Sequence, residues 1–179
     1  MNLPSFDALR RNYPTGANPD AVRAAIGGSI ATQLGPLSNT CVIRMSRAMN
    51  YAGKMYEIPK KGIPAARLYT LEGGDGKQYA LRVAEFLKFM GFRFGRPTIS
   101  KRYKRGEKES VTPFLNKRGI IAWHISGWFD ATGHFTLWDG TRGLYTGGED
   151  YFNDFPKYAL LPNGKTRTIE ETGADLWEC

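Results

Sequence analysis

Apolar residues in the segment 39–53 (NTCVIRMSRAMNYAG) recur at the three- and four-residue spacing of an amphipathic helix. The positions that share this apolar face are Cys41, Met45, Ala48, Met49 and Ala52. Asn39 or Thr40 can cap the start of the helix, and Gly53 can end it. The pattern therefore predicts a helix that carries Cys41 in its first turn.

Two other segments of the N-terminal half also predict helices. The segment 19–28 (PDAVRAAIGG) has a proline at a helix-starting position and a glycine pair at its end. The segment 78–91 (QYALRVAEFLKFMG) carries a broad apolar stripe at helical spacing. The residues of that stripe are Tyr79, Ala80, Val83, Ala84, Leu87 and Met90.

The C-terminal half instead contains short runs that are rich in β-branched and aromatic residues. The runs 119–128 (GIIAWHISGW) and 133–140 (GHFTLWDG) predict strands, and 157–161 and 174–178 predict two more. Because helices come first and strands follow, the expected fold class is α+β, with N-terminal helices packed on an antiparallel sheet. At 179 residues, the chain is expected to form a single domain, 1–179.

Composition narrows the class of protein. Hydrophobic residues make up 41% of the chain and charged residues 23%, which is typical of a globular protein. No run of about 18 apolar residues occurs, and the N-terminal MNLPSFDALRRNYP lacks the apolar core of a secretory signal. We therefore expect neither a membrane span nor a signal peptide. The two cysteines, Cys41 and Cys179, cannot form a disulfide framework, and we expect both to be reduced.

The formal net charge of +8 favours an anionic partner. Much of the excess lies in Arg96–Arg118, which holds eight Lys or Arg and two Glu. This segment mixes charge signs and lacks helical or strand periodicity, so we expect a solvated loop there. The alternative is a nucleic-acid-binding surface in which Tyr103 and Phe114 interleave with the basic residues, but no recognisable binding motif accompanies them.

Cys41 is the candidate nucleophile, because free backbone N–H groups and the helix dipole favour a thiolate in the first turn of a helix. The alternative is a small buried apolar residue on the inner face of the helix. A thiolate enzyme also needs a base, and the chain has two histidines, His124 and His134. We favour His134 because it opens a predicted strand near the edge of the sheet, whereas His124 can simply occupy the less buried side of its strand.

A third polar side chain should orient the imidazole of the base. Asp139 would lie about 16 Å from His134 along one strand and on its opposite face. If DGTRG forms a hairpin turn, the return strand passes His134 at about residue 148. Strand parity then favours Asp150 over Glu149, and a bulge in TGGED would exchange the two.

The motif NTCVIRMSRAMNYAG, followed far downstream by GHFTLWDG, resembles the type VI secretion amidase effectors of the fourth family, which are relatives of the papain-like NlpC-type peptidoglycan peptidases. The resemblance extends from FDALRRNYP to the closing ADLWEC. It implies a papain-like NlpC-type fold with a catalytic cysteine at a helix start and a catalytic histidine on the sheet, which fall on Cys41 and His134. The family's third residue is an aspartate soon after the histidine strand. Its counterpart here is Asp150, although TRGLYTGGEDYF is longer than the family pattern.

The resemblance implies cleavage of the bond between D-glutamate and meso-diaminopimelate in the peptidoglycan stem peptide. Cys41 would attack the carbonyl, His134 would pass the proton to the leaving amine, and backbone N–H groups at the helix start, including that of Cys41, would stabilise the oxyanion. No cofactor and no metal are expected, because two histidines without a second nearby cysteine give poor zinc spacing. Trp128, in the loop before His134, is expected to line the cleft.

The resemblance also implies partners and a route of delivery. The type VI secretion apparatus would carry the protein from the cytoplasm of the producing cell into the periplasm of a target cell. A cognate immunity protein would neutralise it, and a basic cleft rim predicts an acidic patch on that partner. Nucleic acid and membranes are not expected partners. A cysteine hydrolase of the same fold that acts on another amide is the remaining alternative, because one triad serves several reactions.

Overall fold

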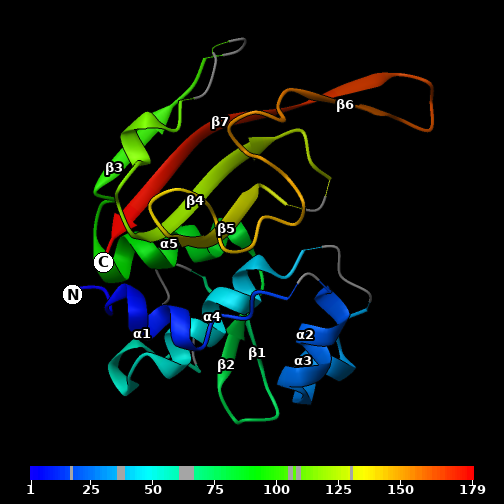
Figure 1. Cartoon of the computed structure of the whole chain (residues 1–179). Coiled ribbons are helices and arrows are strands. Elements are labelled where there is room, and N and C mark those ends of the chain that lie inside the picture. The colour runs from blue at the N-terminus through cyan, green and yellow to red at the C-terminus, as the bar shows by residue number, and fades with distance from the viewer. Residues whose placement is uncertain (17, 36–38, 61–66, 105–106, 108–109, 130) are drawn as a thin grey trace.

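Helices dominate the N-terminal half of the fold, which also holds a short two-stranded hairpin, and antiparallel strands form most of the C-terminal half (Figure 1). The computed structural model describes residues 1–179 except 17, 36–38, 61–66, 105–106, 108–109 and 130. The described helices are α1 (Phe6–Arg11), α2 (Pro19–Ile26), α3 (Gly28–Thr32), α4 (Cys41–Tyr51) and α5 (Val83–Phe94), with single 3₁₀ turns at Lys54–Tyr56 and Thr112–Phe114. The described strands are β1 (Thr70–Glu72), β2 (Gln78–Ala80), β3 (Ile99–Arg102), β4 (Gly119–Ser126), β5 (Gly133–Trp138), β6 (Lys157–Leu160) and β7 (Thr166–Glu178). The predicted α+β class is confirmed.

The main sheet has the strand order β3-β7-β4-β5, and β6 pairs with the N-terminal part of the long strand β7. All of these pairings are antiparallel. Strand β5 forms one edge of this order, and helix α4 packs against it. In the β4–β5 register, Trp123 lies opposite His134 and Ala122 lies opposite Phe135. Because side chains alternate along a strand, His134 and Phe135 face opposite sides of the sheet.

The two faces of the sheet belong to different hydrophobic clusters. On one face, Ile120, Ala122 and Phe135 pack with helices α4 and α5. On the other face, Trp123 packs with aromatic residues of the segment between β5 and β6, which are Tyr151, Phe152 and Phe155. His134 lies on this second face at the edge strand. It is therefore held between the sheet and an aromatic layer.

Helix α4 is buried on nearly all sides, not only along its predicted apolar face. Arg44, Ser46 and Asn50 lie outside that face, yet each is at most 2% exposed. The backbone N–H of Ala80 donates to the Ser46 hydroxyl, and the Asn50 amide donates to the Gln78 carbonyl, so strand β2 satisfies two of these polar groups. The helix that begins at Cys41 is thus fixed by hydrogen bonds as well as by packing. None of the described helices is long and apolar enough to cross a membrane.

The helix predicted over 78–91 is wrong in its first turn. Gln78–Ala80 forms strand β2, and α5 begins at Val83. The glycine-rich GGDGK turn explains the difference, because Gly73 N–H donates to the Lys77 carbonyl at 2.9 Å and Gly76 has a φ of 72°. This turn folds β2 back onto β1, and tertiary pairing overrides the helical periodicity of the segment.

The basic segment Arg96–Arg118 is not a loop throughout, which corrects the sequence-based expectation. Ile99–Arg102 forms strand β3 and pairs with the C-terminal part of β7. Strand β7 is also longer than the predicted strand 174–178, because its N-terminal part pairs with β6 and extends to Thr166. Short edge strands with charged outward positions carry a weak alternating pattern, so sequence periodicity does not detect them.

Candidate active site

Cys41 is the first residue of α4 and is only 2% exposed. Its backbone N–H donates to the Oδ1 atom of Asn39 at 3.0 Å, so the side chain two residues earlier caps the helix start. Burial raises the pKa of the Cys41 thiol to about 11, although the N–H groups of Phe135 and Val42 act in the opposite direction. The helix start alone therefore does not produce the expected thiolate, and Cys41 needs a base.

His134 lies on β5 and is 2% exposed. Its Nε2 atom is 2.8 Å from the backbone carbonyl oxygen of Tyr145. Because a carbonyl only accepts, Nε2 carries the proton and Nδ1 keeps its lone pair. Burial lowers the pKa of His134 to about 4, the hydrogen bond to Tyr145 opposes this effect, and the positive charge of Arg44 adds to it. The imidazole is therefore neutral at pH 7 and presents Nδ1 as a base.

Cys41 lies near the strand that carries His134, because helix α4 packs against the edge strand β5. The backbone N–H of Phe135, the residue after His134, points to the Cys41 sulfur. The adjoining cavity has a volume of about 240 Å³. Its lining residues are Asn39, Trp128, His134, Tyr145, Thr146, Gly147, Glu149 and Tyr151. The size suits a short segment of an extended substrate, because pockets that enclose a whole drug-sized ligand usually exceed roughly 300 Å³.

Trp128 lies in the wall of this cavity. Its ring also contacts Tyr151 and Phe155, with centroids 6.2 and 6.3 Å apart. Tyr151 in turn stacks on the His134 ring at 5.1 Å. The aromatic residues therefore form one side of the cavity and hold the imidazole ring in plane. Among the described residues, no group of three His, Cys, Asp or Glu side chains is placed to bind a metal ion.

Asp150 lies elsewhere. Its carboxylate accepts hydrogen bonds from the backbone N–H of Phe152 at 3.0 Å and from the side chain of Asn153 at 2.8 Å, and so it caps its own turn. Glu149 forms an ion pair with Lys157. Within the described part of the chain, no hydrogen bond or ion pair joins either acidic residue to His134. The structure thus places His134 and Trp128 at one cavity and Cys41 beside the residue that follows His134, and it gives Asp150 other partners.

The hairpin register that selected Asp150 is wrong. Trp138 pairs with Gly143, and Leu144 N–H donates to the Leu137 carbonyl, which shifts the return segment by one residue from the expected pairing. The ladder then ends, because Gly147 and Gly148 have φ values of 70° and 93° and turn the chain away.

The segment that follows the turn after β5 contacts His134 through the backbone carbonyl of Tyr145 and not through a side chain. The N–H of Tyr145 donates to the Thr136 hydroxyl at 3.0 Å, which fixes the peptide whose carbonyl accepts from His134. Sequence analysis missed Tyr145, because a backbone carbonyl acceptor leaves no signature in residue type.

Arg44 is a second residue that sequence analysis missed. It is fully buried, and its guanidinium carbon lies 3.6 Å from the centre of the Tyr145 ring. The guanidinium donates to the Thr40 hydroxyl at 2.8 Å and to the carbonyls of Pro14 and Gly16 at 2.8 and 2.6 Å. Arg44 therefore ties the start of α4 to Tyr145 and to the N-terminal segment. Its charge made it look like a surface residue in the sequence.

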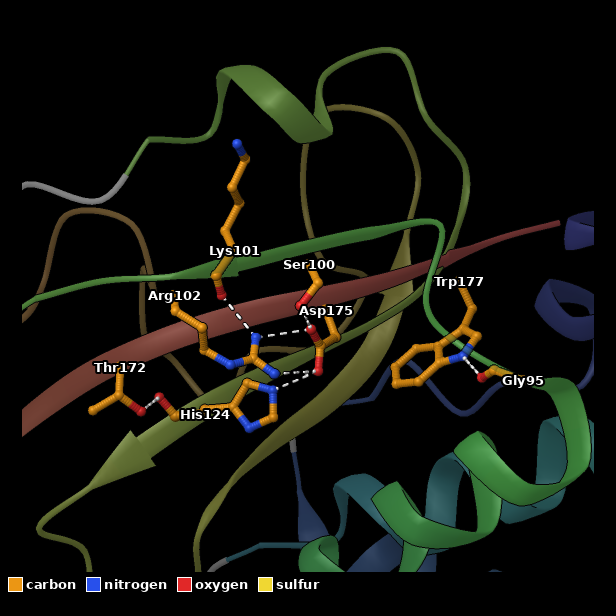
Figure 2. A network of polar contacts seen from close by, with 8 residues as sticks. All are labelled: Gly95, Ser100, Lys101, Arg102, His124, Thr172, Asp175 and Trp177. Carbon is orange, nitrogen blue, oxygen red and sulfur yellow. Dashed lines mark hydrogen bonds and ion pairs between the residues drawn. The ribbon is translucent and has the colours of Figure 1, made fainter.

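His124 faces the opposite side of the sheet from His134 and belongs to a separate network (Figure 2). Its Nε2 atom lies 2.7 Å from Asp175, whose carboxylate also accepts from Arg102 at 2.8 and 3.0 Å and from the Ser100 hydroxyl at 2.6 Å. These residues belong to β4, β7 and β3, so the network crosses three strands. Its role is to join the strands.

Replacing Asp175 with asparagine should lower the free energy of unfolding at pH 7 by about 1.5–3 kcal/mol, the range for hydrogen bonds to a charged group. Burial alone would raise the pKa of Asp175, but the bonds from His124, Arg102 and Ser100 outweigh it and hold that pKa well below its usual range. Such a depressed pKa gives stabilisation that is complete above the unfolded-state value of about 3.9 and is lost as the pH falls below it.

Urea unfolding at several pH values measures this effect. The difference between the wild type and Asp175→Asn should narrow from about pH 4 downwards. Ser100→Ala, which removes one of the donors, should cost less at pH 7. A difference that stays constant between pH 7 and pH 2.5 would contradict the electrostatic origin of the stabilisation.

The comparisons with known proteins agree with the fold. A family model described as "Tae4: Type VI secretion system (T6SS), amidase effector protein 4" matches residues 37–166, a range that includes Cys41 and His134. The class is thus that of the type VI secretion amidase effectors, hydrolases that act on the cell wall and are delivered into target cells. The chain belongs to the Tae4 family. The resemblance seen in the sequence motif is confirmed.

Solved structures match nearly the whole chain. The type VI effector-immunity complex Tae4-Tai4 from Enterobacter cloacae contains a chain that is 29% identical, with a TM-score of 0.75 and 98% of each chain covered. The type VI effector Tae4 from Enterobacter cloacae is 28% identical, with a TM-score of 0.73 and 99% of each chain covered. The Tae4-Tai4 complex from Salmonella Typhimurium shares the fold, with 23% identity, a TM-score of 0.74 and 99% coverage of each chain. No curated protein sequence matches significantly.

Proposed function

We propose that the chain is a cysteine endopeptidase that hydrolyses the amide bond between D-glutamate and meso-diaminopimelate in peptidoglycan stem peptides. The observation that carries this proposal is the position of the Cys41 sulfur beside the backbone of β5, next to a histidine whose ring is fixed by the Tyr145 carbonyl. A buried thiol and an oriented neutral base at one cavity are the groups that acyl transfer from an amide requires.

The chemistry starts from a neutral pair, because the pKa of Cys41 is raised to about 11 and that of His134 is lowered to about 4. The thiol proton passes to Nδ1 of His134 as the sulfur attacks the amide carbonyl. His134 then gives that proton to the nitrogen of meso-diaminopimelate, which leaves as an amine and produces a thioester on Cys41. His134 next takes a proton from a water molecule, and the oxygen of this water attacks the thioester carbonyl. The bond between carbon and sulfur then breaks, the D-glutamate carboxylate is released, and His134 returns the proton to the Cys41 sulfur.

The fixed tautomer gives the Tyr145 carbonyl a part in this sequence. While Nε2–H donates to that carbonyl, only Nδ1 can exchange a proton with Cys41. The imidazolium formed during attack keeps the same hydrogen bond, which is stronger when the donor is charged. The neutral carbonyl can therefore orient His134 in the way that a carboxylate does in other triads.

The net charge of +8 favours the stem peptide as substrate, because this peptide carries several carboxylates. We further propose that a cognate immunity protein with an acidic patch neutralises the effector in the periplasm. Complexes of related Tae4 effectors with Tai4 immunity proteins, from Enterobacter cloacae and Salmonella Typhimurium, support this part of the proposal.

Digestion of purified Gram-negative sacculi, followed by mass spectrometry of the products, tests the proposed bond. Cleavage at this bond leaves a carboxyl terminus on D-glutamate and a free amine on meso-diaminopimelate. New ends at any other amide would show that the same site acts on a different bond, and an absence of new ends with folded wild-type protein would overturn the proposal.

Asp150→Asn should retain activity within about tenfold of the wild type. The orienting role predicted for Asp150 from sequence requires its carboxylate at Nε2, but the Tyr145 carbonyl holds that position, and asparagine can still accept the Phe152 N–H. Kinetics of stem-peptide cleavage measure the effect, with Asp139→Asn as a matched control at another turn-capping aspartate. A loss of up to ~10⁴-fold in kcat for Asp150→Asn alone, as for the aspartate of serine triads, would restore Asp150 as the orienting residue.

A further inference from the structure

We propose that the side-chain amide of Asn39 is a catalytic residue that donates a hydrogen bond to the oxyanion of the tetrahedral intermediate. The inference rests on the proposed cysteine mechanism and adds a group that this mechanism still lacks. A thiolate attack on an amide places a negative charge on the former carbonyl oxygen, and N–H donors about 2.7–3.1 Å away are the usual means of stabilising it.

The donor first expected for this purpose is already occupied. Sequence analysis assigned the oxyanion to backbone N–H groups at the start of the helix, including that of Cys41. In the structure, the Cys41 N–H donates to Asn39 Oδ1 at 3.0 Å. An amide N–H with an acceptor at this distance has its hydrogen-bonding capacity filled, so the oxyanion needs another donor on the cysteine side of the cavity.

The same hydrogen bond fixes the orientation of the Asn39 amide. A backbone N–H can only donate, so the atom that faces it is the oxygen, and the amide nitrogen lies on the opposite branch of the side chain. The nitrogen carries two donors and no acceptor. The hydrogen bond from the Cys41 N–H therefore orients the Asn39 amide so that its nitrogen remains available as a donor.

Asn39 also lines the cavity that His134 lines. The substrate carbonyl must reach the Cys41 sulfur, and Asn39 contacts the main chain of Cys41 from two residues before it. In the resting protein, the side chain of Asn39 donates towards the sulfur and lowers the pKa of the thiol, although burial dominates. As the sulfur bonds to carbon, negative charge moves to the adjacent oxygen, and the donor needs only a small shift to follow it.

Two other polar side chains near the site direct their described hydrogen bonds elsewhere, although the Nη2 atom of Arg44 has no hydrogen-bond partner among the described residues. The Nε2–H of His134 donates to Tyr145, and the described donations of Arg44 go to Thr40, Pro14 and Gly16. Arg44 is also absent from the lining of the cavity as described. Asn39 is a side-chain donor that contacts the main chain of the nucleophile and also lines the cavity.

The first test replaces Asn39 with aspartate. Aspartate keeps the shape and the oxygen that accepts the Cys41 N–H, but it substitutes a carboxylate oxygen for the donor. We expect kcat for stem-peptide cleavage to fall at least 10²–10³-fold, the loss typical of one oxyanion donor, while KM changes only a few-fold. Asn39→Ser, which also keeps a helix-capping oxygen, should show a similar loss of kcat and no carboxylate repulsion.

A matched control is available at another helix start. Asn18 is the N-cap residue of α2, and its Oδ1 accepts from the backbone N–H groups of Asp20 and Ala21 at 2.9 and 3.2 Å. It is not among the described residues that line the cavity. Asn18→Asp should keep wild-type kinetics. Thermal unfolding of all variants shows whether a loss of activity comes from a loss of fold.

Binding of a transition-state analogue distinguishes a donor that stabilises the oxyanion from a residue that only positions Cys41. A peptide aldehyde that ends at the scissile carbonyl adds reversibly to Cys41 and forms a tetrahedral adduct with an oxygen at the oxyanion position. If Asn39 donates to that oxygen, the affinity for the aldehyde should fall in Asn39→Ser by a factor similar to the fall in kcat/KM. The rate of alkylation of Cys41 by iodoacetamide, which builds no oxyanion, should change far less.

The outcomes separate the two proposals. Wild-type kcat in folded Asn39→Asp and Asn39→Ser, or an unchanged aldehyde affinity beside a reduced kcat, would overturn the oxyanion role and leave the proposed function intact. A wild-type protein that forms the aldehyde adduct but never cleaves the stem peptide would overturn the proposed function. In that case, a lower affinity of Asn39→Ser for the aldehyde would still show that Asn39 donates a hydrogen bond to the oxygen of the adduct.

Discussion

A folded Cys41→Ala protein should release no measurable stem-peptide fragments from sacculi, which corresponds to a loss of at least about 10⁴-fold in rate. In the proposed mechanism the Cys41 sulfur bonds to the substrate, and alanine offers no nucleophile in its place. Alanine preserves the helix start, because the cap is made by the Asn39 side chain and the backbone N–H of residue 41. Mass spectrometry of the soluble fraction measures the effect.

The second cysteine supplies the control for this prediction. Cys179 is exposed at the end of the chain, so Cys179→Ala should cleave at the wild-type rate. Circular dichroism and thermal unfolding check that both variants fold. Clear activity in folded Cys41→Ala would remove Cys41 from the mechanism and with it the proposed cysteine chemistry.

His134→Ala should lose about 10³–10⁴-fold in kcat/KM, because a thiol with a pKa raised to about 11 reacts poorly without a base. The matched control is His124→Ala. His124 lies on the opposite face of the sheet and bonds to Asp175, so its loss should lower stability and leave the rate per folded molecule close to that of the wild type. Initial rates, corrected for the folded fraction, decide between the two histidines.

The pH dependence gives an independent check on His134. The base must be neutral, and burial lowers the pKa of His134 to about 4. The value of kcat/KM should therefore stay level at weakly acidic pH and fall only as the pH approaches about 4. An acidic limb centred near 6.5, the ordinary histidine value, would show that the working base is more exposed than His134.

If His124→Ala, and not His134→Ala, is the inactive variant, the assignment of His134 as the base is wrong.

The sequence predicted those elements whose local pattern agrees with their final packing. The helix over 39–53 has a cap, an apolar face and a glycine stop, and the structure places α4 at Cys41–Tyr51 within it. The strands 119–128 and 133–140 appear as β4 and β5 with the same starting residues. Strands β2 and β3 were not predicted, because each is short and is defined by a partner strand far away or across a turn.

The candidate site was predictable where the choice of residue types was small. One internal cysteine and two histidines left few alternatives, and position at a sheet edge separated His134 from His124. The partner of His134 was not predictable in the same way. It depends on a one-residue shift in the hairpin and on the left-handed Gly147 and Gly148, and the final acceptor is a main-chain atom. Arg44 was missed because its burial depends on carbonyl groups supplied by the N-terminal segment.

The burial of Cys41 has a consequence for the chemical durability of the protein. With a pKa raised to about 11, only about one molecule in 10⁴ carries the thiolate at pH 7, and oxidants attack the thiolate form. A cysteine that is also 2% exposed offers peroxide or disulfide reagents almost no access. The low exposure and the raised pKa therefore protect the Cys41 sulfur from oxidation. Exposed Cys179 has no such steric protection, and only the raised pKa of its thiol, about 12, limits its oxidation.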